Sequence, residues 1–250
     1  GQAGSSFPGL FASMARAYLT EFDATEEDFA RVAVKNHENG ILNPKAHIQK
    51  KITIDDVMNS PVVASPLKLY DCCPFSDGAS SVILCSEKFA KANGGDYIEV
   101  IGSGRGGSPA ALQGREHLTT IPSTKIASEA AYKMAGITTK DIDFAEVHDC
   151  FTIAEIIDTE DLGFFEKGKG VQAVREGRTR LNSDISINPS GGLKSKGHPI
   201  GATGVGQVVE VFDQLTGNAG ERTVKDAKIG LTHNFGATGA SCAVHIFQSV

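Results

Sequence analysis

Residues 141–157, DIDFAEVHDCFTIAEII, decide the fold class. The short apolar run at 142–147 predicts a buried strand, and residues 152–162 have the apolar spacing of a helix. The two are separated by the turn HDCF at 148–151. A strand that leads through a short turn into a helix is the repeating unit of α/β proteins. This stretch therefore predicts an α/β domain.

The same alternation continues on both sides of this stretch. The predicted strands are 79–85, 97–102, 142–147, 185–188, 229–233 and 241–247. The predicted helices are 7–35 with a break at 23–28, 86–93, 121–136, 152–162 and 201–215. The segments 36–66 and 163–184 are expected to be loops, because turn-forming and polar residues dominate them. This order predicts a layered fold with a mixed sheet and helices on both faces.

Composition excludes several classes of protein. The chain has 250 residues, of which 40% are hydrophobic and 22% charged, enough apolar surface for a core. A net charge of −6 argues against nucleic acid as a partner. Five cysteines without a CxxC pair or zinc spacing argue against a disulfide scaffold and a metal site, and favour the cytoplasm. No apolar run approaches the ~18 residues of a membrane span, so none is expected.

A glycine-rich motif, GSGRGG at 102–107, follows the predicted strand 97–102. It satisfies the G-x-G-x-x-G pattern of dinucleotide-binding proteins. A dinucleotide site needs a helix that begins within the motif, whereas Pro109 and Gly114 follow here. We therefore expect a flexible glycine loop rather than a dinucleotide site.

The turn HDCF places His148 and Cys150 at the end of a strand and the start of a helix. This is the edge of a sheet at which α/β proteins place their chemistry, and a helix N-terminus there favours negative charge. The alternative is a hydrogen-bonded histidine and a small buried cysteine in the core.

Two further glycine-rich motifs follow. The stretch 188–204 places His198 between glycine and proline, in backbone that is all turn, which favours a positioned donor or base over core packing. Its alternative is a structural or capping histidine. HNFGATG at 233–239 predicts a glycine turn between the last two strands. Taken alone, that turn is only a hairpin.

Together these segments resemble the thiolase family. GGLKSKGHPIGATG at 191–204 resembles the family's GHP motif, and HDCF stands where many thiolases have Asn-Glu-Ala-Phe. HNFGATG stands where those enzymes have a Cys-x-Gly motif. The HDCF variant, with Asn234 in place of a cysteine, is similar to the sterol-carrier-protein-2-type thiolases and their archaeal relatives. The opening residues 1–18 resemble the entry to the family's inserted loop domain.

The resemblance implies a thiolase-like layered αβαβα fold built from two similar α/β halves. On that basis residues 1–66 form the loop domain that shapes the coenzyme A site. Residues 67–95 end the N-terminal half, and 96–250 form the C-terminal half. The family's nucleophilic cysteine belongs upstream of the loop domain, whereas Cys72 and Cys73 follow it. We therefore expect the nucleophile to lie outside these residues and this chain alone to be inactive.

The resemblance also implies three catalytic roles. Cys150 is expected to exchange the α-proton of the acyl-CoA, replacing the cysteine that other thiolases carry at Asn234. His198 is expected to support the nucleophile and to donate to the thioester oxygen. His148 is expected to help form an oxyanion site in place of the motif asparagine.

Three more positions complete the expected site. The amide of Gly236 contributes to a second oxyanion hole, Phe151 forms a wall of the acyl pocket, and Asn234 lines the pocket. Coenzyme A is anionic, and cations of the loop region could bind it, although a solvated charged stretch explains them equally well; they are Lys45, His47, Lys50 and Lys51.

The implied function is an acyl-CoA C-acyltransferase, most simply an acetoacetyl-CoA thiolase that condenses two acetyl-CoA or runs in reverse. One alternative is a non-catalytic thiolase-like scaffold that binds CoA or a protein, and another is a degradative 3-ketoacyl-CoA thiolase. No permanently bound cofactor is expected, because CoA thioesters are the substrates. The expected assembly is a homodimer or homotetramer, and the archaeal-like resemblance also implies a complex with hydroxymethylglutaryl-CoA synthase and a small zinc-containing protein.

Overall fold

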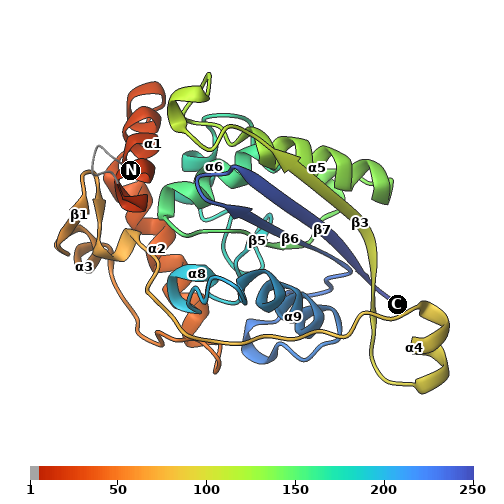
Figure 1. Cartoon of the computed structure of the whole chain (residues 1–250). Coiled ribbons are helices and arrows are strands. Elements are labelled where there is room, and N and C mark those ends of the chain that lie inside the picture. The colour runs from red at the N-terminus through yellow and green to blue at the C-terminus, as the bar shows by residue number, and fades with distance from the viewer. Residues whose placement is uncertain (1–5) are drawn as a thin grey trace.

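The computed structural model describes residues 6–250, with a five-stranded mixed sheet at the centre (Figure 1). Residues 1–5, which begin the stretch compared above with the loop-domain entry, lie outside the described part. The helices are α1 (Phe7–Glu21), α2 (Glu26–Ile41), α3 (Ile54–Met58), α4 (Glu87–Asn93), α5 (Pro122–Ala135), α6 (Thr152–Asp161), α7 (Gly170–Arg175), α8 (Gly192–Ser195) and α9 (Thr203–Leu215). The strands are β1 (Val62–Ala64), β2 (Leu67–Lys68), β3 (Ile98–Gly107), β4 (Phe144–Glu146), β5 (Ser186–Ile187), β6 (Ile229–Gly236) and β7 (Ser241–Ser249).

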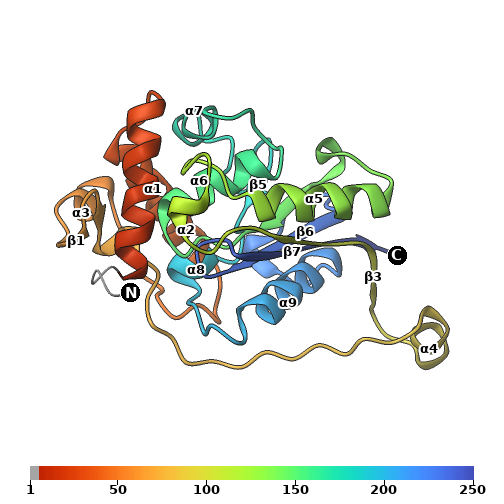
Figure 2. The same cartoon turned by 45° about the horizontal axis from the view of Figure 1, so that its top comes forward.

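The central sheet has the order β3-β7-β6-β4-β5. β3, β7 and β6 pair antiparallel, whereas β4 pairs parallel with both β6 and β5. α5 and α9 lie on opposite faces of this sheet (Figure 2). The predicted α/β class, with a mixed sheet covered on both faces, is confirmed. Because β4 and β6 are parallel neighbours, the turns that follow them emerge at the same edge.

The glycine motif at 102–107 is part of β3, so the expectation of a flexible loop there is wrong. Gly102, Gly104 and Gly106 alternate along the strand and face α5. A Cβ on them would lie 2.6, 1.9 and 2.0 Å from backbone oxygens of α5, respectively. The glycines therefore serve close packing of a helix on a strand rather than an active-site turn or a dinucleotide.

The segment 79–85 is not the buried strand that its apolar composition predicts. It runs extended toward α4 without a partner strand among the described residues. Ile83 is 90% exposed and Leu84 is 81% exposed. A strand needs both a hydrogen-bonded neighbour and a covered face, and the described chain provides neither here.

The N-terminal elements α1–α3 and β1 gather on one side of the molecule (Figure 1). The predicted break before α2 is confirmed, with Thr25 and Asp28 forming a capping box. The expected loops 36–66 and 163–184 also contain short elements: the end of α2, α3, β1 and α7. Among residues 6–250, no helix is long and apolar enough to cross a membrane.

Candidate active site

Three turns that are distant in sequence meet at the shared edge of the sheet. His148 follows β4, His198 precedes α9, and Phe235 lies near the end of β6. The ring centroid of His148 is 5.0 Å from that of His198, at an interplanar angle of 87°, and 4.4 Å from that of Phe235. The structure therefore brings together the HDCF, GHP and HNFG motifs.

The HDCF turn is held to the GHP segment through the side chain of Asp149. Its carboxylate accepts hydrogen bonds from the amides of Leu193 at 2.7 Å and Lys194 at 3.3 Å, at the start of α8. The side-chain amide of Asn36, on α2, donates to the same carboxylate at 2.8 Å. A Cβ on Gly192 would lie 2.4 Å from this carboxylate, so the close approach requires glycine there. Asp149 thus fixes how the HDCF turn and the GHP segment sit relative to each other.

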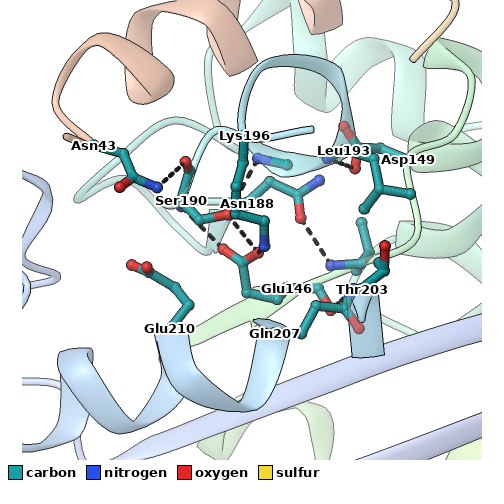
Figure 3. A network of polar contacts seen from close by, with 12 residues as sticks. Asn43, Glu146, Asp149, Asn188, Ser190, Leu193, Lys196, Thr203, Gln207 and Glu210 are labelled. Carbon is teal, nitrogen blue, oxygen red and sulfur yellow. Dashed lines mark hydrogen bonds and ion pairs between the residues drawn. The ribbon is translucent and has the colours of Figure 1, made fainter. Parts of the chain in front are cut away.

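The GHP segment is tied to the end of β4 by a second carboxylate, Glu146, which is fully buried. Glu146 accepts from the hydroxyl of Ser190 at 2.6 Å and pairs with the Nζ of Lys196 at 3.2 Å (Figure 3). The side-chain amide of Gln207, on α9, donates to the carbonyl oxygens of Glu146 and His233 at 3.4 and 3.1 Å. These contacts give the polar groups of the loops hydrogen-bond partners, which an apolar core alone could not provide.

His198 is held at two points. Its backbone amide donates to the hydroxyl of Ser76 at 3.1 Å, and its Nδ1 lies 2.8 Å from the hydroxyl of Thr203. Burial lowers the pKa of His198, and the cation of Lys196 lowers it further. A neutral imidazole at physiological pH is therefore favoured, which suits a proton acceptor.

His148 is buried and carries an unsatisfied ring nitrogen. Its Nδ1 has no hydrogen-bond partner within residues 6–250. Burial, together with His198 and His233, lowers the pKa of His148 well below its usual value, so the ring is neutral. The Asn234 side chain acts in the opposite direction through a hydrogen bond. A buried, neutral imidazole with a free nitrogen is suited to hydrogen-bonding a polar ligand atom.

Cys150 lies in the same turn and is buried. Burial raises the pKa of Cys150 well above its usual value, and Cys73 and Asp158 raise it further. Its sulfur is therefore a thiol at rest. Lys194 acts in the opposite direction on this pKa. The Nζ of Lys194 is fully buried, and the described residues offer it no hydrogen-bond partner.

The segment 71–76, whose contacts the sequence does not predict, crosses both the HDCF turn and the GHP segment. The backbone of Cys72 forms an isolated β-bridge with that of Phe151, and the backbone of Phe75 forms one with that of His198. The amide of Cys73 donates to the carbonyl of Cys150 at 3.0 Å. No periodicity or motif could have identified these contacts, because they join segments that are far apart in the chain.

The remaining expected residues lie around this centre. Phe151 is buried and stacks on Phe11 of α1 at 4.6 Å, Asn234 lies on β6, and Gly236 is exposed at the end of β6. Of the loop cations, His47 contacts the hydroxyl of Ser76 at 3.0 Å, and Lys45 pairs with Asp213 at 3.3 Å. Within the described chain, no cluster of three or more His, Cys, Asp or Glu side chains is arranged to hold a metal ion.

Known proteins with similar sequences match both parts of the chain. The family descriptions "Thiolase, N-terminal domain" and "Thiolase C-terminal domain-like" match residues 7–88 and 104–249. An acetyl-CoA acetyltransferase of Methanothermobacter thermautotrophicus is 50% identical over 247 residues, 99% of this chain and 64% of that protein. Sterol carrier protein 2 of Bos taurus is 37% identical, over 93% of this chain and 44% of that protein.

Solved structures share the fold. The "Ltp2-ChsH2(DUF35) aldolase" has a TM-score of 0.88 and 25% identity, covering 98% of this chain and 64% of that one. A monomeric SCP2-thiolase-like protein of Mycobacterium smegmatis has a TM-score of 0.75 at 14% identity, covering 98% of this chain and 52% of that one. The chain thus spans less than two thirds of the length of these relatives. The sequence matches show that it belongs to the thiolase family, on the branch of the archaeal acetyl-CoA acetyltransferases and the sterol-carrier-protein-2-type thiolases.

Proposed function

We propose that the complete protein containing these residues is an acyl-CoA C-acyltransferase that joins two acetyl-CoA molecules or cleaves acetoacetyl-CoA. The contact between the rings of His148 and His198, together with the buried Cys150 two residues after His148 in the same turn, carries the proposal. The 50% identity to a protein named acetyl-CoA acetyltransferase supports the choice of acetyl groups.

In the proposed first step, an acetyl group moves from CoA to a nucleophilic cysteine, for which we assign no residue of this chain. His198 accepts the proton of that cysteine. Cys150 begins as a thiol, and it therefore donates its proton to the departing CoA thiolate. The cation of Lys194 favours the Cys150 thiolate that results.

In the second step, the Cys150 thiolate removes an α-proton from a second acetyl-CoA, and the carbanion attacks the carbonyl carbon of the acetylated cysteine. The carbon–carbon bond forms as the carbon–sulfur bond to the cysteine breaks, and the released cysteine thiolate takes its proton back from His198. Negative charge develops on the thioester oxygen during proton removal. The His148 imidazole and the Gly236 amide are the proposed hydrogen-bond donors to negatively charged thioester oxygens. Each positioned donor stabilises the transition state by a few kcal/mol. Phe151 walls the acyl pocket, and Asn234 lines it beside His148.

The assignment of Cys150 is tested with Cys150→Ala in the complete protein. We expect cleavage of acetoacetyl-CoA to fall by at least about 100-fold, because general acid–base catalysis contributes that much or more. Acetyl exchange between acetyl-CoA and labelled CoA should persist in part. Cys242→Ala removes another buried thiol, on β7, and is the matched control that should leave both reactions unchanged.

Condensation at the wild-type rate in Cys150→Ala would contradict this role. A wild-type protein that binds acetyl-CoA but catalyses neither reaction would instead favour a non-catalytic CoA-binding scaffold. Comparing acetoacetyl-CoA with a longer 3-ketoacyl-CoA separates the proposed reaction from degradative thiolysis.

We further propose a cytoplasmic homodimer or homotetramer that associates with hydroxymethylglutaryl-CoA synthase and a small zinc-containing protein. The solved relative named for both Ltp2 and ChsH2(DUF35) supports a second polypeptide in this fold family. Co-purification of the complete protein with each candidate, followed by mass measurement of the intact assembly, tests the proposal.

A further inference from the structure

The hydroxyl of Thr203 contacts two polar atoms of the GHP turn. It lies 2.8 Å from Nδ1 of His198 and 3.0 Å from the carbonyl oxygen of Pro199. Thr203 is the first residue of α9 and is 3% exposed, so water does not replace either contact. Its place in the site network is visible in Figure 3.

Counting protons decides how these two contacts are made. A threonine hydroxyl has one hydrogen to donate and can also accept, whereas a carbonyl oxygen only accepts. Both contacts are satisfied together only when the hydroxyl donates to Pro199 and accepts from an N–H at Nδ1 of His198. If Nδ1 lacked a hydrogen, the hydroxyl would have to turn toward it and lose Pro199.

A neutral imidazole carries its hydrogen on one nitrogen. Burial and Lys196 lower the pKa of His198 and thereby favour this neutral form. With the hydrogen on Nδ1, the lone pair is on Nε2. We propose that Thr203 is a positioning residue that fixes His198 as the Nδ1–H tautomer, so that Nε2 is the nitrogen that accepts the proton of the nucleophilic thiol.

The backbone of the turn supports the same orientation. The amide of His198 donates to Ser76 at 3.1 Å, and Gly197, at φ +110°, lets this hydroxyl approach. A Cβ on Gly197 would lie 2.7 Å from the Ser76 oxygen. The residue is thus held at its amide by Ser76 and at its ring by Thr203, which leaves Nε2 as the ring nitrogen without a hydrogen-bond partner among residues 6–250.

The inference deepens the proposed function and rests on it for the role of Nε2. When Nε2 takes the thiol proton, the ring becomes an imidazolium that still donates from Nδ1 to Thr203. No hydrogen bond of the turn has to break during this transfer. A preset tautomer therefore spares the site a rearrangement in the acyl-transfer step.

The first experiment measures ¹⁵N chemical shifts of the histidine rings in the complete protein labelled with ¹⁵N-histidine. His198→Asn identifies the His198 signals by their loss. We expect a protonated Nδ1 and an unprotonated Nε2 in the wild type and in Thr203→Ser, which keeps the hydroxyl. We expect Thr203→Val, which keeps the shape but not the hydroxyl, to shift His198 toward the Nε2–H form.

The second experiment separates positioning from folding by steady-state kinetics. Thr203→Val should lower kcat for acetoacetyl-CoA cleavage by at least about tenfold with little change in KM, since a base with the wrong tautomer loses up to ~10⁴-fold. Thr203→Ser should restore the rate to within about threefold.

An Nε2–H signal for His198 in the wild type overturns the tautomer assignment, and this result depends on no substitution at Thr203. Wild-type kcat in a folded Thr203→Val overturns the positioning role. The tautomer is measured without any activity assay. An inactive wild type with the expected Nδ1–H signal therefore counts against the proposed function while supporting the tautomer.

Discussion

Lys196 acts on His198 through charge rather than through contact with a ligand. Lys196 precedes His198 by two residues, and its ammonium lies 3.2 Å from the buried carboxylate of Glu146. Next to burial, this cation is the cause of the lowered pKa of His198. A base is active in its unprotonated form, so a lower pKa extends activity to lower pH.

We therefore expect Lys196→Gln to move the acidic limb of kcat/KM for acyl transfer to higher pH. The glutamine amide can still bond Glu146, but the positive charge is lost and the carboxylate charge of Glu146 is left unbalanced. Both changes raise the pKa of His198. A pH profile of the complete protein measures the shift, and Lys225→Gln, on an exposed turn, is the control. An acidic limb that stays in place would refute this electrostatic role.

At the residue scale, the sequence identifies the motif histidines but not the residues that hydrogen-bond to them. His148 and His198 could be expected at one edge, because the carboxyl ends of parallel strands meet there. Ser76 could not, because 122 positions separate it from His198. Thr203 is visible within GATG, yet its hydrogen bonds depend on the local fold of the turn.

At the element scale, β3 and α5 show how one pattern fits two structures. G-x-G-x-x-G fits a phosphate loop and also a strand against which a helix packs closely. The many glycines of this stretch favour a loop. In the structure, Gly102, Gly104 and Gly106 alternate along β3 on the face that packs against α5. The short helices α7 and α8 escape prediction for a related reason, since each begins at glycine and is too short to show periodicity.

Two glycine substitutions on β3 test this packing. A Cβ at Gly104 would lie 1.9 Å from the carbonyl oxygen of Ala127, whereas the nearest atom to a Cβ at Gly107 is 3.9 Å away. We expect Gly104→Ala to destabilise the protein by about 1–3 kcal/mol, the range for overpacked sites. Gly107→Ala should be neutral or slightly stabilising, because alanine restricts the unfolded chain.

The free energies of unfolding in urea measure both effects. Equal stability of the two variants would show that α5 can move away from β3 at little cost, contrary to the close packing of these two elements.

At the scale of the whole molecule, an apolar crevice of about 820 Å³ separates the extended segment 81–85 and α4 from β3 and α9. Val82, Ile83, Leu84, Phe89 and Phe212 are among the residues that line it. The apolar composition of residues 79–85 predicts that this segment is buried. Burial requires a strand or helix packed against the segment, and the described residues supply none. An exposed extended segment with unpaired backbone groups is a site of association between chains.

We expect Ile83→Glu to reduce concentration-dependent association of the 250-residue polypeptide, because it places a charge in this crevice. Met134→Glu is the matched control: Met134 is 63% exposed on α5, so the same charge is added on another face of the molecule. Light scattering during size-exclusion chromatography over a range of concentrations measures the average mass of each variant. The crevice is the associating surface only when Ile83→Glu lowers that mass and Met134→Glu does not. An equal effect of both substitutions would assign association to net charge instead, since each makes the chain one unit more acidic than its −6.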